Sequence, residues 1–250
     1  PTFSLQDDAV VLLRGDEIVA HAETCASRGE INVSPRVRGF GVGTRLMQWV
    51  EERGRAKGER EIRQTVFDTA ASSVAVLLAN GYRVAYTSWI LEIPLDERPP
   101  DPRPPPGIEI RAYRPGAEDR EVYRIIEDAF NELPGRVATP FEDWAATSIL
   151  RADFEHSLLQ VAVDGDTLVG ACIGFNYEDE GVWVQQLAVK ASHRNRGIAQ
   201  ALLQQAFLVS WERGEPASGL STDSRTGALS LYESVGMRIK HSATNYTKDL

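Results

Sequence analysis

The hydrophobic pattern of residues 184–214 predicts a buried strand followed by an amphipathic helix. Residues 184–189, Val-Gln-Gln-Leu-Ala-Val, have the apolar and β-branched content of a buried strand. A short basic turn follows, and from Gly197 onward Ile198, Leu202, Ala206 and Val209 recur on one helical face. Gly214 is a natural stop for that helix.

Similar segments fill the rest of the chain. Upstream, the pattern predicts a strand over residues 108–113 and helices over 119–131 and 141–151. Strand-like and helix-like segments alternate in the first 93 residues as well. This alternation predicts an α/β or α+β architecture built on a mixed sheet.

A proline-rich segment separates the two halves. Seven of the 13 prolines lie between Pro94 and Pro106, and proline can join neither a helix interior nor a central strand. We expect a stiff, polyproline-like connector over residues 94–107. The predicted domains are therefore residues 1–93 and residues 108–250.

The two halves repeat each other. Residues 14–20 match 164–170, residues 33–43 match 189–199, and residues 77–82 match 232–237. Three matches in the same order at nearly constant spacing indicate an internal duplication, and we expect the drift in spacing to fall in the loop near 177–181. About 50 residues (108–157) precede the repeat in the second half, whereas nine precede Val10 in the first. The first copy has therefore lost its opening strand and helices, or the sequence begins inside a longer gene product.

Composition narrows the class of protein. The chain is 42% hydrophobic and 25% charged, with a net charge of −9, so it is an ordinary globular sequence without the basic face of a nucleic-acid-binding protein. No apolar run reaches the about 18 residues of a membrane span, and the start has no secretory signal. Cys25 and Cys172 are predicted to be core residues, and the four histidines show no metal-ligand spacing. We expect a cytoplasmic protein with no metal, no membrane and no nucleic-acid partner.

The turn between the strand and the helix carries the candidate chemistry. Arg194-x-x-Gly197-x-Ala199 places small residues and free N–H groups at a helix start, which suits a pyrophosphate. The same arrangement occurs in residues 38–43, Arg-Gly-Phe-Gly-Val-Gly. Neither copy has the spacing of a Rossmann dinucleotide fingerprint, and there is no Walker G-K-[S/T]. The repetition favours a phosphate-binding function over simple packing.

Together with Leu187-Ala188-Val189 and the segment Ala228-x-x-Leu231-Tyr232-x-x-x-Gly236-Met237, this turn resembles the GNAT superfamily of N-acetyltransferases. The resemblance covers nearly all of the second half, and the first half from its second strand onward. The whole chain is similar to a tandem GNAT protein with a mycothiol synthase-like architecture. The resemblance implies acetyl-CoA as cosubstrate, a small-molecule amine as acceptor, and a strand that bulges and parts from its neighbour near Leu220 to admit the pantetheine arm.

The resemblance also implies the site residues. In the second half, the cofactor-binding candidates are Leu187, Ala188, Val189, Arg194, Asn195, Arg196, Gly197, Ile198, Ala199 and Gln200. In the first half, they are Val33, Arg38, Gly39, Gly41, Gly43 and Thr44. The catalytic candidates are the backbone N–H of Val189, as an oxyanion donor, and the hydroxyl of Tyr232, as the acid that protonates the departing thiolate.

Two positions depart from the family pattern. Leu77 occupies the place of Tyr232 in the first half and cannot donate a proton, so the second half is the predicted catalytic domain. Gln185 and Gln186 lie where many members carry a carboxylate base. A water relay, or an acceptor amine of low pKa, would remove the need for one. The acidic run over residues 178–180 is either a solvated loop or an attraction for a cationic acceptor.

The sequence leaves three functions open. The first is an N-acetyltransferase acting on a small amine. The second is an acyl-CoA-binding or sensing protein without turnover, which the missing carboxylate favours. The third is a protein acetyltransferase, which depends on whether the cleft beside residues 141–144 is open.

Overall fold

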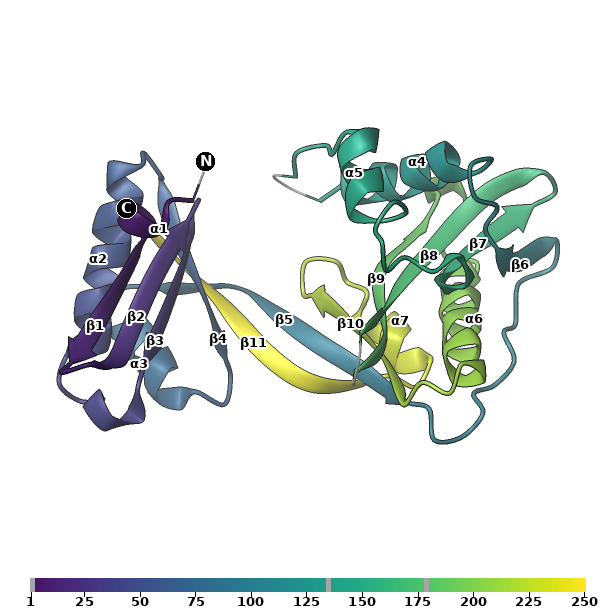
Figure 1. The fold of residues 1–250 in the computed structure, drawn as a ribbon. Helices are drawn as coiled ribbons and strands as arrows, with labels where there is room; N and C mark the ends of the chain where they lie inside the picture. The colour runs from purple at the N-terminus through teal and green to yellow at the C-terminus, as the bar shows by residue number, and fades with distance from the viewer. Residues whose placement is uncertain (1–2, 134–135, 178–179) are drawn as a thin grey trace. The chain divides into compact units, whose positions relative to one another are not determined.

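The computed structural model describes residues 3–133, 136–177 and 180–250 and divides into two compact units. The first unit runs to Ser88 and includes His241–Leu250, and the second is Trp89–Lys240. Both are mixed α/β units (Figure 1).

In the first unit, strands and helices alternate after a one-turn helix. Its elements are α1 (Leu5–Asp8), β1 (Ala9–Arg14), β2 (Glu17–Cys25), β3 (Arg28–Val33), a 3-10 turn (Pro35–Val37), α2 (Val42–Ala56), β4 (Glu61–Phe67), α3 (Ala71–Ala79) and the start of β5 (Arg83–Pro94). The strand order is β1-β2-β3-β4, followed by the last strand of the chain, β11 (Arg238–Asp249). Helices α2 and α3 pack on one face of this sheet around Val50, Leu77 and Tyr82.

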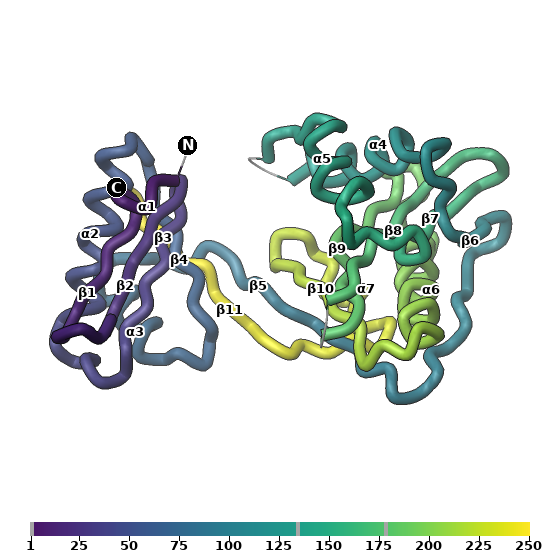
Figure 2. Tube along the Cα trace, viewed as in Figure 1, coloured from purple at the N-terminus to yellow at the C-terminus, as the bar shows by residue number. Residues whose placement is uncertain are grey.

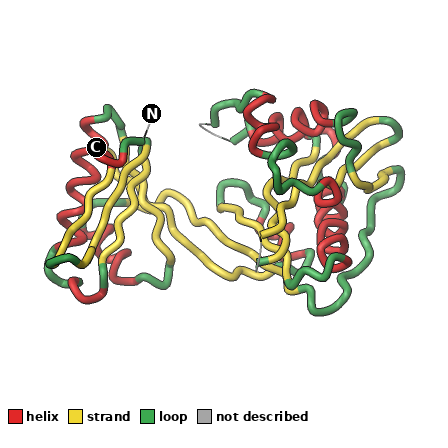
Figure 3. The backbone as a smooth tube through the Cα atoms, viewed as in Figure 1, coloured by secondary structure: helices red, strands yellow, loops and turns green. Residues whose placement is uncertain are grey.

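The second unit adds a strand and two helices before the same series. Its elements are β6 (Ile108–Ala112), α4 (Asp119–Phe130), α5 (Phe141–Thr147), a 3-10 turn (His156–Leu158), β7 (Leu159–Asp164), β8 (Thr167–Tyr177), β9 (Gly181–Val189), a second 3-10 turn (Ala191–His193), α6 (Ile198–Glu212), β10 (Ala217–Asp223) and α7 (Leu229–Ser234). The strand order is β5-β10-β9-β8-β7-β6. One apolar cluster joins the sheet to α6 and α7 and another joins it to α4 and α5, so both faces of the sheet are covered (Figure 3).

The structural detail confirms the duplication. A bulge shifts the β1–β2 register between Leu12 and Leu13, and an equivalent bulge shifts β7–β8 between Ala162 and Val163, 150 residues later. Each copy then has a 3-10 turn and a 15-residue helix whose N-cap is a glycine with positive φ. The two tandem copies therefore share backbone irregularities as well as strand order.

Two long strands cross from one unit to the other. Strand β5 begins in the first unit and its residues from Trp89 onward belong to the second, whereas β11 begins in the second and its residues from His241 onward belong to the first (Figure 2). Residues 243–249 of β11 pair antiparallel with residues 61–67 of β4. The predicted linear domains, 1–93 and 108–250, do not include this exchange. Between them, residues 95–107 form neither helix nor strand.

The two sheets differ on the face that lies opposite α2 or α6. In β8, this face carries Ala171, Ile173 and Phe175, which pack against α4 and α5. In β2, the residues 150 positions earlier are His21, Glu23 and Cys25, and all three are exposed. The first unit therefore has a polar, open face where the second has a helix-covered core.

Two expectations need correction. Cys25 is exposed rather than buried, because it lies on that open face, whereas Cys172 is buried as expected. Helix α5 ends at Thr147 instead of residue 151, because the backbone of Ser148 leaves the helical region. No helix in the described part of the chain is long and apolar enough to span a membrane.

Candidate functional site

Strand β9 parts from β10 after its third residue. The two strands run parallel and pair at Val182 and Trp183 with Ser218 and Gly219, but β9 continues to Val189 and β10 to Asp223. Beyond Trp183, the edge of β9 that faces β10 is therefore free to pair with an extended ligand.

A bulge at Gln185 lies where this opening begins. The β8–β9 register passes from Ile173–Gln186 to Gly174–Val184, so Gln185 is an extra residue in β9. The matching strand of the first unit, β3, pairs with β2 without interruption. Part of the spacing drift between the halves is therefore this single inserted residue, and the rest falls before it. A bulge bends a strand and re-aims its side chains, so the second unit has a feature of an active-site strand that the first lacks.

The predicted phosphate turn joins the end of β9 to α6. Asn195 has φ 60° and Gly197, the N-cap of α6, has φ 86°. These left-handed residues turn the chain so that the first N–H groups of α6, at Ile198, Ala199 and Gln200, lie at the turn without intrahelical partners. A helix start of this kind favours an anion.

Two arginines border the turn. Arg194 donates from Nε to the carbonyl oxygen of Val189 at 3.1 Å and makes a bidentate ion pair with Glu132 at 2.6 and 2.9 Å. This pairing raises the pKa of Arg194 and lowers the pKa of Glu132. Arg196 lies 3.7 Å from Asp164. Both cations are thus placed beside the turn, and Arg194 ties it to the end of β9.

Tyr232 on α7 is half-buried against the α6 side of the sheet. Its hydroxyl contacts Thr222, which lies on β10 beyond the last residue that pairs with β9. Burial raises the pKa of Tyr232, the Cys172 thiol adds to this, and the hydrogen bond with Thr222 acts in the opposite direction. The phenol is therefore a protonated group next to the open segment of the sheet.

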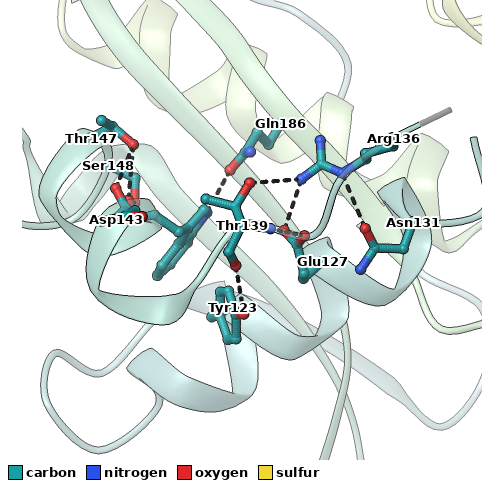
Figure 4. Close-up of polar contacts among 10 residues, drawn as sticks. Tyr123, Glu127, Asn131, Arg136, Thr139, Asp143, Thr147, Ser148 and Gln186 are labelled. Atoms are coloured by element: carbon teal, nitrogen blue, oxygen red, sulfur yellow. Dashed lines mark hydrogen bonds and ion pairs between the residues drawn. The ribbon is translucent and has the colours of Figure 1, made fainter. Parts of the chain in front are cut away.

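The opposite side of β9 is bounded by α4 and α5. Trp144 on α5 donates from its indole nitrogen to Oε1 of Gln186 at 3.0 Å (Figure 4). Tyr123 and Phe141 pack edge-to-face on each other, and both rings pack against Trp144. An aromatic wall thus adjoins Gln186.

A buried carboxylate binds two residues shortly before α5. Glu127 accepts from Arg136 at 2.8 Å and from the backbone N–H of Thr139 at 2.7 Å, and the Thr139 carbonyl accepts from Tyr123 at 2.7 Å (Figure 4). Both oxygens of Glu127 are engaged, so this carboxylate holds Thr139 in place two residues before α5, the helix that carries Trp144.

The first unit has the same turn without the acid. Arg38 follows a 3-10 turn, Gly39 has φ 80°, and Gly41 caps α2 with φ 77°. Val33 ends β3, and Gly43 and Thr44 lie in the first turn of α2. Leu77, at the Tyr232 position, is only 2% exposed and packs in the core.

The structure thus brings the second-half candidates together: Leu187, Ala188 and Val189 on β9, the turn Arg194–Gly197, and the first helical turn Ile198–Gln200. Sequence reasoning missed Glu132, Glu127 and Thr222, which have no motif and lie far from the turn along the chain. Glu178 and Asp179 of the acidic run lie outside the described residues. Among the residues that are described, no group of three or more His, Cys, Asp and Glu side chains gathers as a metal site.

The acetyltransferase (GNAT) family model matches residues 4–82 and 120–237, a segment in each half. Two mycothiol acetyltransferases are similar in sequence. That of Salinispora tropica is 30% identical over 87% of this chain and 71% of its own length. That of Catenulispora acidiphila is 28% identical over 52% of this chain, and the match spans only 43% of its length.

Solved structures agree with this. A GCN5-related N-acetyltransferase from Sphaerobacter thermophilus has a TM-score of 0.85 at 32% identity, over 99% of this chain and 82% of that one. A tandem GNAT protein from the clavulanic acid biosynthesis pathway shares the fold, with a TM-score of 0.69 at 16% identity over 97% of this chain and 82% of that one. The chain therefore belongs to the GNAT family of acetyltransferases and is an acyltransferase of the tandem type.

Proposed function

We propose that the second unit transfers an acetyl group from acetyl-CoA to the primary amine of a small molecule. The pantetheine arm pairs with β9 beyond Trp183, the pyrophosphate binds at the turn Arg194–Gln200, and the backbone N–H of Val189 faces the thioester oxygen. The observation that carries this proposal is the bulged strand β9, which parts from β10 and leads directly into a left-handed turn and a helix start.

In the proposed reaction the amine nitrogen attacks the thioester carbon and forms the amide bond. The carbon–sulfur bond breaks, its electron pair goes to sulfur, and Tyr232 donates a proton to the thiolate. The nitrogen loses one proton to water, and the tyrosinate regains one. The products are the acetylated amine and CoA.

The first unit serves a structural role or holds acyl-CoA without turnover. Its turn is intact, but β3 has no bulge and Leu77 has no proton to give. The similarity of two mycothiol acetyltransferases to this chain supports a small molecule as the acceptor.

The second candidate function is acyl-CoA sensing without turnover. The specific observation in its favour is that Gln185 and Gln186 supply no carboxylate at the bulge.

Thiol release from acetyl-CoA with a panel of amines separates the two functions. We expect turnover, and we expect Tyr232→Phe to lower kcat by about 10²- to 10⁴-fold, the usual contribution of a general acid, with little change in affinity for acetyl-CoA. Tyr113→Phe is the matched control, because Tyr113 is also a buried tyrosine of the second unit with a raised pKa but lies at the end of β6. Tight binding of acetyl-CoA with no thiol release on any amine would establish the sensor instead.

A further inference from the structure

The amide of Gln186 is held in one orientation. The indole N–H of Trp144 can only donate a hydrogen bond, so the atom of Gln186 that it contacts is the oxygen, as the 3.0 Å contact with Oε1 shows. The amide nitrogen therefore points away from Trp144. No described residue accepts a hydrogen bond from it, and the side chain is only partly buried. Gln186 presents two N–H donors next to the start of the opening in the sheet.

Three glutamates on α4 and just after it are already paired with cations. Glu127 is bound by Arg136 and Thr139, and Glu132 by Arg194. Glu121 pairs with Lys190 at 3.2 Å. Each of these three carboxylates is therefore already paired with a basic side chain.

We infer that Gln186 selects the acceptor: an amine with a carbonyl group on the carbon next to the one that carries nitrogen. This inference rests on the proposed function and names its substrate class. The same oxygen meets two requirements of the site. It accepts a hydrogen bond from the Gln186 amide, and it withdraws electrons from the amine.

Electron withdrawal from the amine removes the need for a general base, which Gln185 and Gln186 cannot supply. An alkyl ammonium such as lysine's has a pKa of about 10.4, whereas an amino group next to a carbonyl has a pKa of about 7.7 to 8.0. At pH 7.5, the neutral and nucleophilic fraction of the second is therefore larger by about two orders of magnitude. Such an amine loses its proton to water before it attacks, and no protein carboxylate is needed.

The experiment compares glycinamide with propylamine, which is similar in size but has no oxygen. The value of kcat/KM is measured from about pH 6 to about 11 for each amine, so that the range includes the pKa of both. The pH midpoint is taken from the value per total amine, and the preference between the amines from the value per neutral amine. We expect the pH midpoint to follow the pKa of each amine rather than one fixed pKa of the enzyme. After correction for the neutral fraction, glycinamide remains preferred by about 10-fold, as one hydrogen bond from Gln186 predicts.

Two substitutions test the residue. Gln186→Leu removes the donor and abolishes the corrected preference, while the midpoint still follows the amine. Gln186→Glu supplies a carboxylate that still accepts from Trp144. It raises the rate with propylamine near neutral pH and introduces a pH midpoint that is the same for both amines. Gln205→Glu on α6 makes the same change of charge away from the site and leaves both readouts unchanged.

Affinity for acetyl-CoA, measured in each variant, shows that the fold and cofactor site are intact. The inference would be overturned if the preference for glycinamide over propylamine, per neutral amine, were the same in the unmodified enzyme and in Gln186→Leu. So would a midpoint that is independent of the amine in the unmodified enzyme. Either result leaves the acetyltransferase proposal in place, whereas the absence of thiol release with every amine removes the proposal itself.

Discussion

At the scale of single residues, Tyr232 has the environment of an acid. Its hydroxyl contacts Thr222 in the segment where β9 and β10 have parted, and burial raises its pKa above the ordinary value of 10.0. A phenol in this state keeps its proton through the whole neutral and mildly alkaline range.

The pH dependence of kcat tests this state. Because the pKa of Tyr232 is raised, the protonated form that the reaction requires is lost only as pH rises above 10. We therefore expect any alkaline decline of kcat to be centred above pH 10 with an acceptor that is already neutral there. A decline centred between pH 8 and 9 would show that the acid is another group, or that Tyr232 is not shielded from water.

At the scale of elements, the turn before each long helix depends on a left-handed glycine. Gly41 and Gly197 are N-caps with φ of 77° and 86°, and nothing lies within 4 Å of the position that a Cβ would take. An alanine there is therefore strained by its backbone alone and not by a clash.

We expect Gly197→Ala and Gly41→Ala to lower the free energy of unfolding by similar amounts, about 1–2 kcal/mol each. Their effects on the ligand should differ. Gly197→Ala distorts the first N–H groups of α6, and so weakens acetyl-CoA binding to the second unit and lowers turnover. Gly41→Ala leaves turnover unchanged. Denaturant titration and steady-state kinetics measure the two effects. A loss of turnover in Gly41→Ala as large as that in Gly197→Ala would contradict the proposal that the second unit is the catalytic one.

Local elements were predictable because their signals are local. The strand before Arg194, the glycine turn and the apolar face of α6 all follow from residues that are neighbours in the sequence, and the structure has them at the expected positions. The bulge at Gln185 was not predictable, because it depends on the pairing with β8. The exposure of Cys25 has a similar cause: an alternating pattern shows that β2 has two faces, but not that helices cover only one of them.

At the scale of the whole molecule, each unit depends on a strand from the other half of the chain. Tyr246 of β11 is 4% exposed and packs with Leu46 and Val50 of α2. Leu91 of β5 is fully buried with Leu202 of α6. The polar face of β2 and the missing acid further distinguish the first unit from the second.

This exchange predicts that core substitutions act at a distance in sequence. Tyr246→Ala, near the end of the chain, should lower the stability of the first unit by about 3–5 kcal/mol, and Leu91→Ala should lower that of the second by about 2–5 kcal/mol. Hydrogen exchange locates each effect: faster exchange in α2 and β4 for the first substitution, and in α6 and β10 for the second. The opposite assignment would mean that each half keeps its own last strand.

The sequence alone does not show this exchange. Residues 83–94 and 238–249 have strand-like patterns that suit either sheet, and only the pairing of β11 with β4 distinguishes the two arrangements. Residues 95–107 form neither helix nor strand, and a linear boundary does not describe units that exchange strands.

Calorimetric titration of acetyl-CoA into Arg194→Glu and Arg38→Glu, with turnover measured alongside, tests the account most directly. Charge reversal at Arg194 removes a cation from the phosphate turn of the second unit and also breaks its ties to Glu132 and Val189. One charge-assisted contact is worth about 1.5–3 kcal/mol, so we expect Arg194→Glu to lower the affinity of the second unit for acetyl-CoA by at least about 10-fold, and turnover with it. Arg38→Glu, in the first unit, should change turnover by less than about 2-fold. Equal losses of turnover in the two variants, or no heat of acetyl-CoA binding to the unmodified protein, would contradict the proposal that the second unit binds acetyl-CoA and transfers its acetyl group.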